Sequence, residues 1–225
     1  MKPSLLLLAL IFVISSNTFS QVRKKQEIQN NPADISEYFL LIPSETHWAL
    51  PGDDQDPFTG RQRYFKPDPH CKVTIDKKNA YIHIWFDTEL ESTFTMCYFV
   101  KADKTKVLAV HYYQAGGDCD SYLIKFYTYS PDTKKFTDVT KEVFPTLTLK
   151  DLKPTQQIPV DFVYTLPQYG TIINAKADNI CEQDTYGRIT ESFMDYFQKY
   201  QKLPYKNIQL KWNKEKGVFE KGEVK

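Results

Sequence analysis

The chain has 225 residues, with 29 Lys or Arg against 28 Asp or Glu, so its formal net charge at pH 7 is +1. This balance gives no overall attraction to nucleic acid or to an anionic membrane, and we expect no nucleic-acid partner. Aromatic residues are frequent (15 Tyr, 15 Phe, 3 Trp) and glycines few (8), which favours strands and argues against disorder beyond the termini.

The first 20 residues have the pattern of a secretory signal peptide. Lys2 precedes an apolar run from Leu5 to Ile14, and small and polar residues follow. A helix needs about 20 apolar residues to cross a bilayer, so this run predicts no stable membrane span. We expect cleavage after Ser20, and no Cys lies near that position to carry a lipid anchor. The sequence therefore predicts a secreted or periplasmic protein.

The rest of the chain divides into a short lead and one domain. Residues 21–32 are polar and predict a flexible N-terminal lead, while 33–225 are predicted to form a single β-rich domain. Segment 44–70 is rich in Pro, Gly and Asp and predicts a long loop, and loops of this length are often functional.

A short helix is predicted just before that loop. Asp34 and Glu37 have the spacing of a capping box, and Pro43 ends the segment. Between them, apolar residues recur at helical spacing: Ile35, Tyr38, Phe39 and Ile42. We expect about two turns of helix covering one end of a sheet.

Five β-hairpins are predicted from residue 71 onward. In each, two segments rich in aromatic and β-branched residues flank a turn of polar residues or Pro and Gly. Their sequences are CKVTI-DKKN-AYIHIWF, FTMCYFV-KADKTK-VLAVHYY, YLIKFYTY-SPDTKK-FTDVT, DFVYTL-PQYG-TIINAKA and NIQLKW-NKEKG-VFEKGEV. Such local hairpins build antiparallel meanders.

Two helical segments interrupt the strands. Residues 140–152 predict one helical turn, and 189–202 predict a long helix with a stripe formed by Ile189, Phe193, Phe197 and Tyr200. The predicted fold class is therefore α+β and predominantly antiparallel β. A meander of hairpins would pack against one long helix in the C-terminal half and the short N-terminal helix.

Four cysteines in an exported chain predict two disulfides, because an oxidising compartment pairs thiols. The positions in the hairpin pattern favour Cys71–Cys97 and Cys119–Cys181, with Cys97 as a buried free thiol as the alternative. Cys119 is also a candidate nucleophile. Asp118 and Asp120 beside it would raise its pKa, which is the wrong direction for activation, so we expect a structural role.

The histidines suggest a site but no established chemistry. His83 and His111 fall mid-strand, where they could share a sheet face as a metal pair or an acid/base dyad. The favoured interpretation is that the two histidines are polar positions on a face lined by aromatic residues and have no chemical role. The sequence has no recognised metal-ligand spacing and no nucleophile or phosphate-binding motif, so we predict no metal and no cofactor and assign no catalytic residue. A hydrolase would require these histidines to converge with Asp118 and Glu89 in one cleft.

The remaining signal is a surface rich in tyrosine. Tyr combines a ring with a hydroxyl and suits recognition surfaces and sugar stacking. The candidate binding residues are Tyr112, Tyr113, Tyr127, Tyr129 and His111. The leading hypothesis is an exported, non-enzymatic binding module that recognises a protein or glycan through these strands and the 44–70 loop. Burial of both strand faces, one of them by the helix over 189–202, is the favoured interpretation of the rings themselves. The alternative functions are a secreted hydrolase using scattered His, Asp and Glu residues, and a purely structural or envelope-associated protein.

Overall fold

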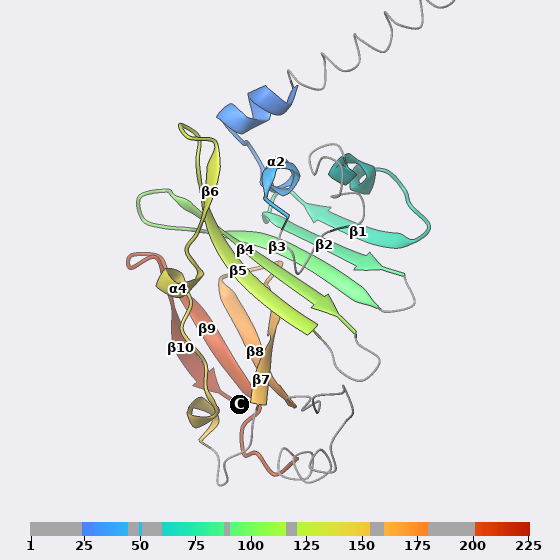
Figure 1. The fold of residues 1–225 in the computed structure, drawn as a ribbon. Coiled ribbons are helices and arrows are strands. Elements are labelled where there is room, and N and C mark those ends of the chain that lie inside the picture. The colour runs from blue at the N-terminus through green and yellow to red at the C-terminus, as the bar shows by residue number, and fades with distance from the viewer. Residues whose placement is uncertain are drawn as a thin grey trace, which may run out of the picture.

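The computed structural model describes residues 24–44, 50, 60–87, 91–115, 121–153, 160–179 and 201–225. They form two antiparallel β-sheets and a few short helices (Figure 1). The first sheet has six strands in sequential order: β1 (Cys71–Asp76), β2 (Tyr81–Phe86), β3 (Ser92–Val100), β4 (Lys106–Gln114), β5 (Ser121–Ser130) and β6 (Lys135–Asp138). The second has four, in the order β10 (Val218–Val224), β9 (Asn207–Asn213), β8 (Ile172–Asn179) and β7 (Val160–Thr165).

All five hairpins predicted from the sequence form. They pair β1 with β2, β3 with β4, β5 with β6, β7 with β8, and β9 with β10. The polar turns supply the unusual backbone that tight connections need. Gly217, in the β9–β10 turn, has a φ of 66°, and a Cβ there would lie 2.8 Å from Cε of Lys101. The positive φ favours glycine at this position, and a side chain there would also have to displace the flexible end of Lys101.

The predicted fold class is wrong in its overall arrangement. The strands form two sheets, and in the described part of the chain no long helix packs against either of them. After β6 the chain passes through two short helices, α4 (Thr140–Val143) and η2 (Leu149–Leu152), before it enters the second sheet. The second sheet covers the face that we had assigned to a helix over 189–202, a segment that lies outside the described residues.

The core between the sheets is rich in aromatic rings. Phe126 of β5 and Phe99 of β3 both contact Phe219 of β10, with ring centroids 5.4 and 4.7 Å apart. The β8 strand contributes small residues, Ala175 and Ala177, both fully buried. Small side chains let the backbones of the two sheets approach, and the rings fill the remaining volume.

The opposite face of the six-stranded sheet is covered by helices. α2 (Ile35–Leu41) and the single turn η1 (Gln62–Phe65) pack there, and Phe39 contacts Phe94 of β3 with ring centroids 5.5 Å apart. The molecule thus has three layers: helices, six-stranded sheet, four-stranded sheet (Figure 1). Residues 24–30 are helical, with Ile28 buried, where the sequence predicted a flexible lead.

The N-terminus of α2 is capped as predicted. The Asp34 side chain accepts hydrogen bonds from the backbone N–H groups of Ser36 and Glu37, at 2.8 and 3.3 Å, and also pairs with Lys77 at 2.8 Å. Because these N–H groups have no partner inside the helix, the cap stabilises the fold.

Replacing Asp34 by Ala is expected to lower the free energy of unfolding by about 1 kcal/mol, because two helix N–H groups lose their acceptor. Urea denaturation would measure the loss. Asp34→Asn is the matched control: it keeps the cap and removes only the exposed ion pair, so most of the stability should remain. Equal losses in both variants would assign the effect to the ion pair instead.

Candidate functional site

Three polar side chains lie in a row across the centre of the six-stranded sheet. The register pairs His83 of β2 with Thr95 of β3, and Thr95 with His111 of β4. We call this row the polar ladder. Directly paired residues project from the same face of a sheet, so the two histidines share a face with one strand between them. Nδ1 of His83 lies 2.9 Å from Oγ1 of Thr95.

The polar ladder forms one wall of a pocket between the two sheets, which we call the inter-sheet pocket. Its volume is about 280 Å³. The six-stranded sheet also contributes Tyr81, Thr93 and Tyr113, and the opposite wall is β7 and the residue after it: Val163, Tyr164, Thr165 and Leu166. None of these described lining residues is Asp, Glu, Lys or Arg.

His111 is the most unusual residue of the pocket. It is 5% exposed, and its Nε2 atom has no hydrogen-bond partner among the described residues. A buried polar atom without a partner costs free energy, and such atoms are rare in folded proteins. A ligand or a water molecule with a hydrogen-bonding group would satisfy this nitrogen.

Both imidazoles are neutral at pH 7. Burial, and secondarily the proximity of His83, lowers the pKa of His111 to about 4. Burial also lowers the pKa of His83. Each neutral ring presents one donor and one acceptor. The described walls can therefore exchange hydrogen bonds with a ligand without presenting charge to it.

Aromatic rings flank the polar ladder. The ring of Tyr81 stacks on that of His83 at a centroid distance of 6.4 Å and an interplanar angle of 15°. Tyr113 stacks on Tyr122 of β5 at 5.4 Å and 26°. Ring faces bind the apolar faces of ring-shaped ligands, and nearby hydroxyls bind their polar edges.

The candidate residues predicted from the sequence divide between two faces. His111 and Tyr113 line the inter-sheet pocket. Tyr112, Tyr127 and Tyr129 pack in the core beneath α2, and Tyr127 is only 2% exposed. The central strands are covered on both faces, as the burial interpretation held, but the described cover of the second face is the four-stranded sheet. The five residues thus do not form one recognition surface.

Sequence reasoning missed three residues of the pocket's six-stranded wall, namely Tyr81, Thr93 and Thr95. Alternation in YIHIWF places Tyr81 and His83 on one face. The register that adds Thr95 could not be read from the sequence, because it depends on how β2 pairs with β3.

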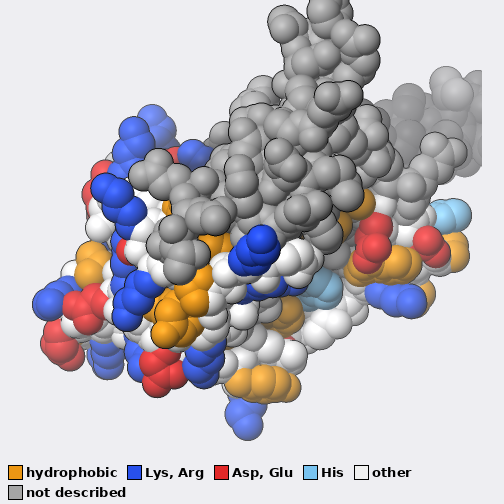
Figure 2. All heavy atoms as spheres, turned by 90° about the horizontal axis from the view of Figure 1, so that it is seen from below, with side chains coloured by type: hydrophobic (Ala, Val, Ile, Leu, Met, Phe, Trp, Pro, Cys, Tyr) orange, Lys and Arg blue, Asp and Glu red, His pale blue; other side chains and the backbone are white. Residues whose placement is uncertain are grey.

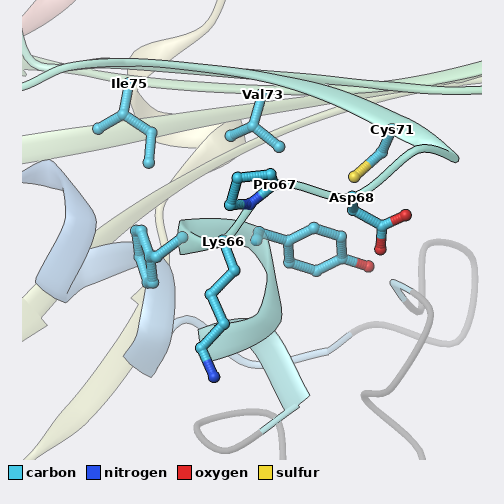
Figure 3. Close-up of a pocket in the computed structure, with 8 residues that line it drawn as sticks. Lys66, Pro67, Asp68, Cys71, Val73 and Ile75 are labelled. Atoms are coloured by element: carbon cyan, nitrogen blue, oxygen red, sulfur yellow. The ribbon is translucent and has the colours of Figure 1, made fainter.

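A second hollow, which we call the edge pocket, lies between the edge strand β1 and the segment around η1. Its volume is about 540 Å³. Figure 3 shows Cys71, Val73 and Ile75 projecting from β1 above Pro67. Burial, and then the charge of Asp68, raises the pKa of the Cys71 thiol. A raised pKa leaves little thiolate, so the edge pocket does not hold an activated nucleophile.

The predicted Cys71–Cys97 bridge is absent, because both residues are free thiols. Cys71 pairs with Phe86 at one end of β2, whereas Cys97 pairs with Tyr81 at the other end, so the two sulfur atoms lie far apart. Cys97 is buried, as the alternative interpretation held. The second predicted pair, Cys119 and Cys181, lies outside the described residues, as do the hydrolase candidates Asp118 and Glu89.

The described part of the 44–70 segment contributes to the core. Leu50, Arg61 and Tyr64 are each no more than 3% exposed. Within η1, Phe65 is 40% exposed and the Arg63 side chain is 49% exposed. These buried positions anchor the segment to the sheet, whereas the described residues from Phe65 to His70 are mostly exposed.

Charge does not mark a further site on the face shown in Figure 2, where described basic and acidic side chains are interleaved. Within the described residues, no three His, Cys, Asp or Glu side chains gather as a metal site would require. No described helix has the length and apolar character needed to cross a bilayer.

One solved structure, of a domain of an uncharacterized protein from Porphyromonas gingivalis W83, is similar to this chain. The TM-score is 0.51 at 11% sequence identity, and the match covers 84% of this chain and 97% of that one. Similarity at this level of identity concerns the fold alone. No family model and no curated protein matches the sequence.

Proposed function

We propose that the chain is an exported, non-enzymatic binding module and that the inter-sheet pocket holds one sugar ring of a glycan. The observation that carries this proposal concerns His111, which lines the pocket and whose buried Nε2 has no hydrogen-bond partner among the described residues. A ligand that fills the pocket and donates or accepts a hydrogen bond there would remove the cost of that buried atom.

The chemistry of the walls supports a neutral, hydroxylated ligand. Thr93, Thr95 and the two neutral imidazoles offer both donors and acceptors, as sugar hydroxyls require. The rings of Tyr81 and Tyr113 supply apolar faces for the ring carbons. The volume of about 280 Å³ lies just below the range of drug-sized ligand pockets, roughly 300–1,000 Å³, and suits a ligand of one ring.

A protein partner and a hydrolytic activity are less well supported. A protein partner would need an exposed surface, whereas three of the four candidate tyrosines pack beneath α2. The hydrogen bond between His83 and Thr95 resembles a base and a nucleophile. However, the described lining contains no carboxylate to orient either imidazole.

Two adjacent tyrosines provide a matched test of the pocket. Tyr113 lines it, while Tyr112, the next residue of the same strand, packs on the opposite face of the sheet. We expect an array of neutral mono- and oligosaccharides to retain the protein, and calorimetric titration with the best sugar to give the dissociation constant. Tyr113→Ala should weaken binding at least tenfold, about 1.4 kcal/mol, whereas Tyr112→Ala should not.

Thermal melts of both variants would confirm that each is folded at the titration temperature. Retention of no sugar by the wild-type protein would contradict the proposal. Equal affinities for the Tyr113→Ala and wild-type proteins would contradict it as well. Release of a shortened glycan during the titration would instead favour the hydrolase.

A further inference from the structure

A second buried polar atom without a partner lies on the helical face of the molecule. In the part of the chain that the structure describes, only Oγ of Ser36 shares this property with His111 Nε2. Ser36 lies in the first turn of α2 and is 6% exposed. Its backbone N–H already donates to Asp34, so the cap leaves the hydroxyl itself unsatisfied.

Ser36 is one of the residues that line a pocket of about 470 Å³, which we call the helical pocket. Its walls come from the helix over 24–30, from α2, from η1 and the residue after it, and from the β1–β2 turn. The apolar part of the lining is formed by Ile28, Leu40 and Phe65. Ile28 and Leu40 are 6% exposed each and pack together, which gives the pocket a firm floor.

The charged part of the lining is mainly basic. Lys24, Lys66 and Lys77 line the helical pocket together with a single acid, Glu37. Lys77 pairs with Asp34, and Glu37 accepts a hydrogen bond from the N–H of Ala33 at 2.6 Å.

Lys24 and Lys66 are exposed and form no ion pair with a described residue. Lys66 lines the edge pocket as well as the helical pocket, and Figure 3 shows its side chain extending away from Val73 and Ile75. Two exposed ammonium groups next to an apolar floor attract a ligand that has one anionic end and one apolar end.

We propose that the helical pocket binds a small anionic amphiphile, namely a carboxylate on a single alkyl chain. The alkyl chain would lie on Ile28, Leu40 and Phe65, and the carboxylate would pair with Lys24 or Lys66. The Ser36 hydroxyl would donate a hydrogen bond to a ligand oxygen. This site is independent of the proposed glycan pocket, which lies on the other face of the six-stranded sheet.

Titration of the full chain with decanoate by calorimetry tests the proposal, with 1-decanol as the uncharged probe of equal length. We expect saturable binding of decanoate at a ratio of one to one, at least tenfold tighter than that of the alcohol. Ser36→Ala should weaken decanoate binding about tenfold, which corresponds to the lower limit for one hydrogen bond to a charged group. Lys66→Gln should weaken it severalfold and reduce its dependence on salt.

Lys78→Gln and Tyr113→Ala are the controls. Lys78 is an exposed residue next to Lys77 and does not line the helical pocket, so its removal should leave the affinity unchanged. Tyr113→Ala should also leave it unchanged, which separates this site from the inter-sheet pocket. The proposal is overturned if decanoate shows no saturable binding, if the alcohol binds equally well, or if Ser36→Ala and Lys66→Gln both retain wild-type affinity.

Discussion

Replacing Arg61 by Ala is expected to lower the free energy of unfolding by about 3–5 kcal/mol. Arg61 is 0% exposed, although it lies in a segment that the sequence indicated to be a surface loop. One guanidinium nitrogen donates to the carbonyl oxygens of Phe39 and Ile42, and the other donates to Oγ of Ser44 at 3.0 Å. The guanidinium carbon also lies 5.5 Å from the centroid of the Phe39 ring.

The size of this effect follows from what the substitution leaves behind. The carbonyl oxygens at the C-terminal end of α2 have no partner inside the helix, and Arg61 supplies one. Without it, buried acceptors lose their donor, and each such loss costs about 1–3 kcal/mol. The missing side chain also leaves a cavity beside Phe39, which adds to the cost.

Urea denaturation would measure the loss, with two control variants. Arg61→Lys keeps the charge but cannot reproduce the fork of donors, so we expect an intermediate stability. Arg63→Ala removes a neighbouring arginine whose side chain is 49% exposed and pairs with Asp68, and little change is expected. A loss for Arg61→Ala no larger than that for Arg63→Ala would contradict the structural role described above.

Acidification from pH 7 to pH 4 is expected to remove about 3 kcal/mol of stability through His111 alone. In the unfolded chain its pKa is about 6.5, whereas in the folded protein burial lowers the pKa to about 4. Between these values the unfolded state binds more protons than the folded state. Stability is therefore complete above about pH 6.5 and is lost as the pH falls toward 4.

His111→Gln isolates this contribution, because glutamine keeps polar atoms but does not titrate in this range. We expect the free energy of unfolding of the variant, measured by urea denaturation, to change less between pH 7 and pH 4 than that of the wild type. The other titratable groups that line the pocket are His83, Tyr81, Tyr113 and Tyr164. Burial also lowers the pKa of His83, so part of the slope should remain in the variant.

His70→Gln serves as the control for the pH experiment, since His70 is exposed and lies outside the pocket. Its difference in stability between the two pH values should match that of the wild type. A wild-type protein that is equally stable at pH 4 and pH 7, or a His111→Gln variant with an undiminished difference, would contradict the assignment.

Local features of the fold could be predicted from the sequence. The five hairpins form because each turn and its two arms are contiguous, so their signals do not depend on the rest of the molecule. Asp34 and Pro43 bracket α2 for the same reason. The division into two sheets could not be predicted this way. It depends on which faces pack, and β3 is buried on both faces along most of its length.

The site was predictable only in part. Alternation placed His111 and Tyr113 on one face, but the same alternation places Tyr112 on the other, so a run of tyrosines does not make one surface. Ser36 and Arg61 gave no signal at all. A serine in a helix and an arginine in a loop are both common exposed residues, and only long-range packing buries them here.

In the described part of the chain, every strand pairing joins strands that are consecutive in sequence. A low sequence separation between pairing strands favours fast folding, because each strand can add to the one that precedes it in the chain. During synthesis the six-stranded sheet is finished first, while residues 160–225 are still to come. Until they are synthesised, the apolar face of this sheet that carries Phe99 and Phe126 remains exposed to solvent. Exposed apolar surface makes the nascent chain prone to aggregation during this interval. Rapid formation of the four-stranded sheet would shorten that exposure.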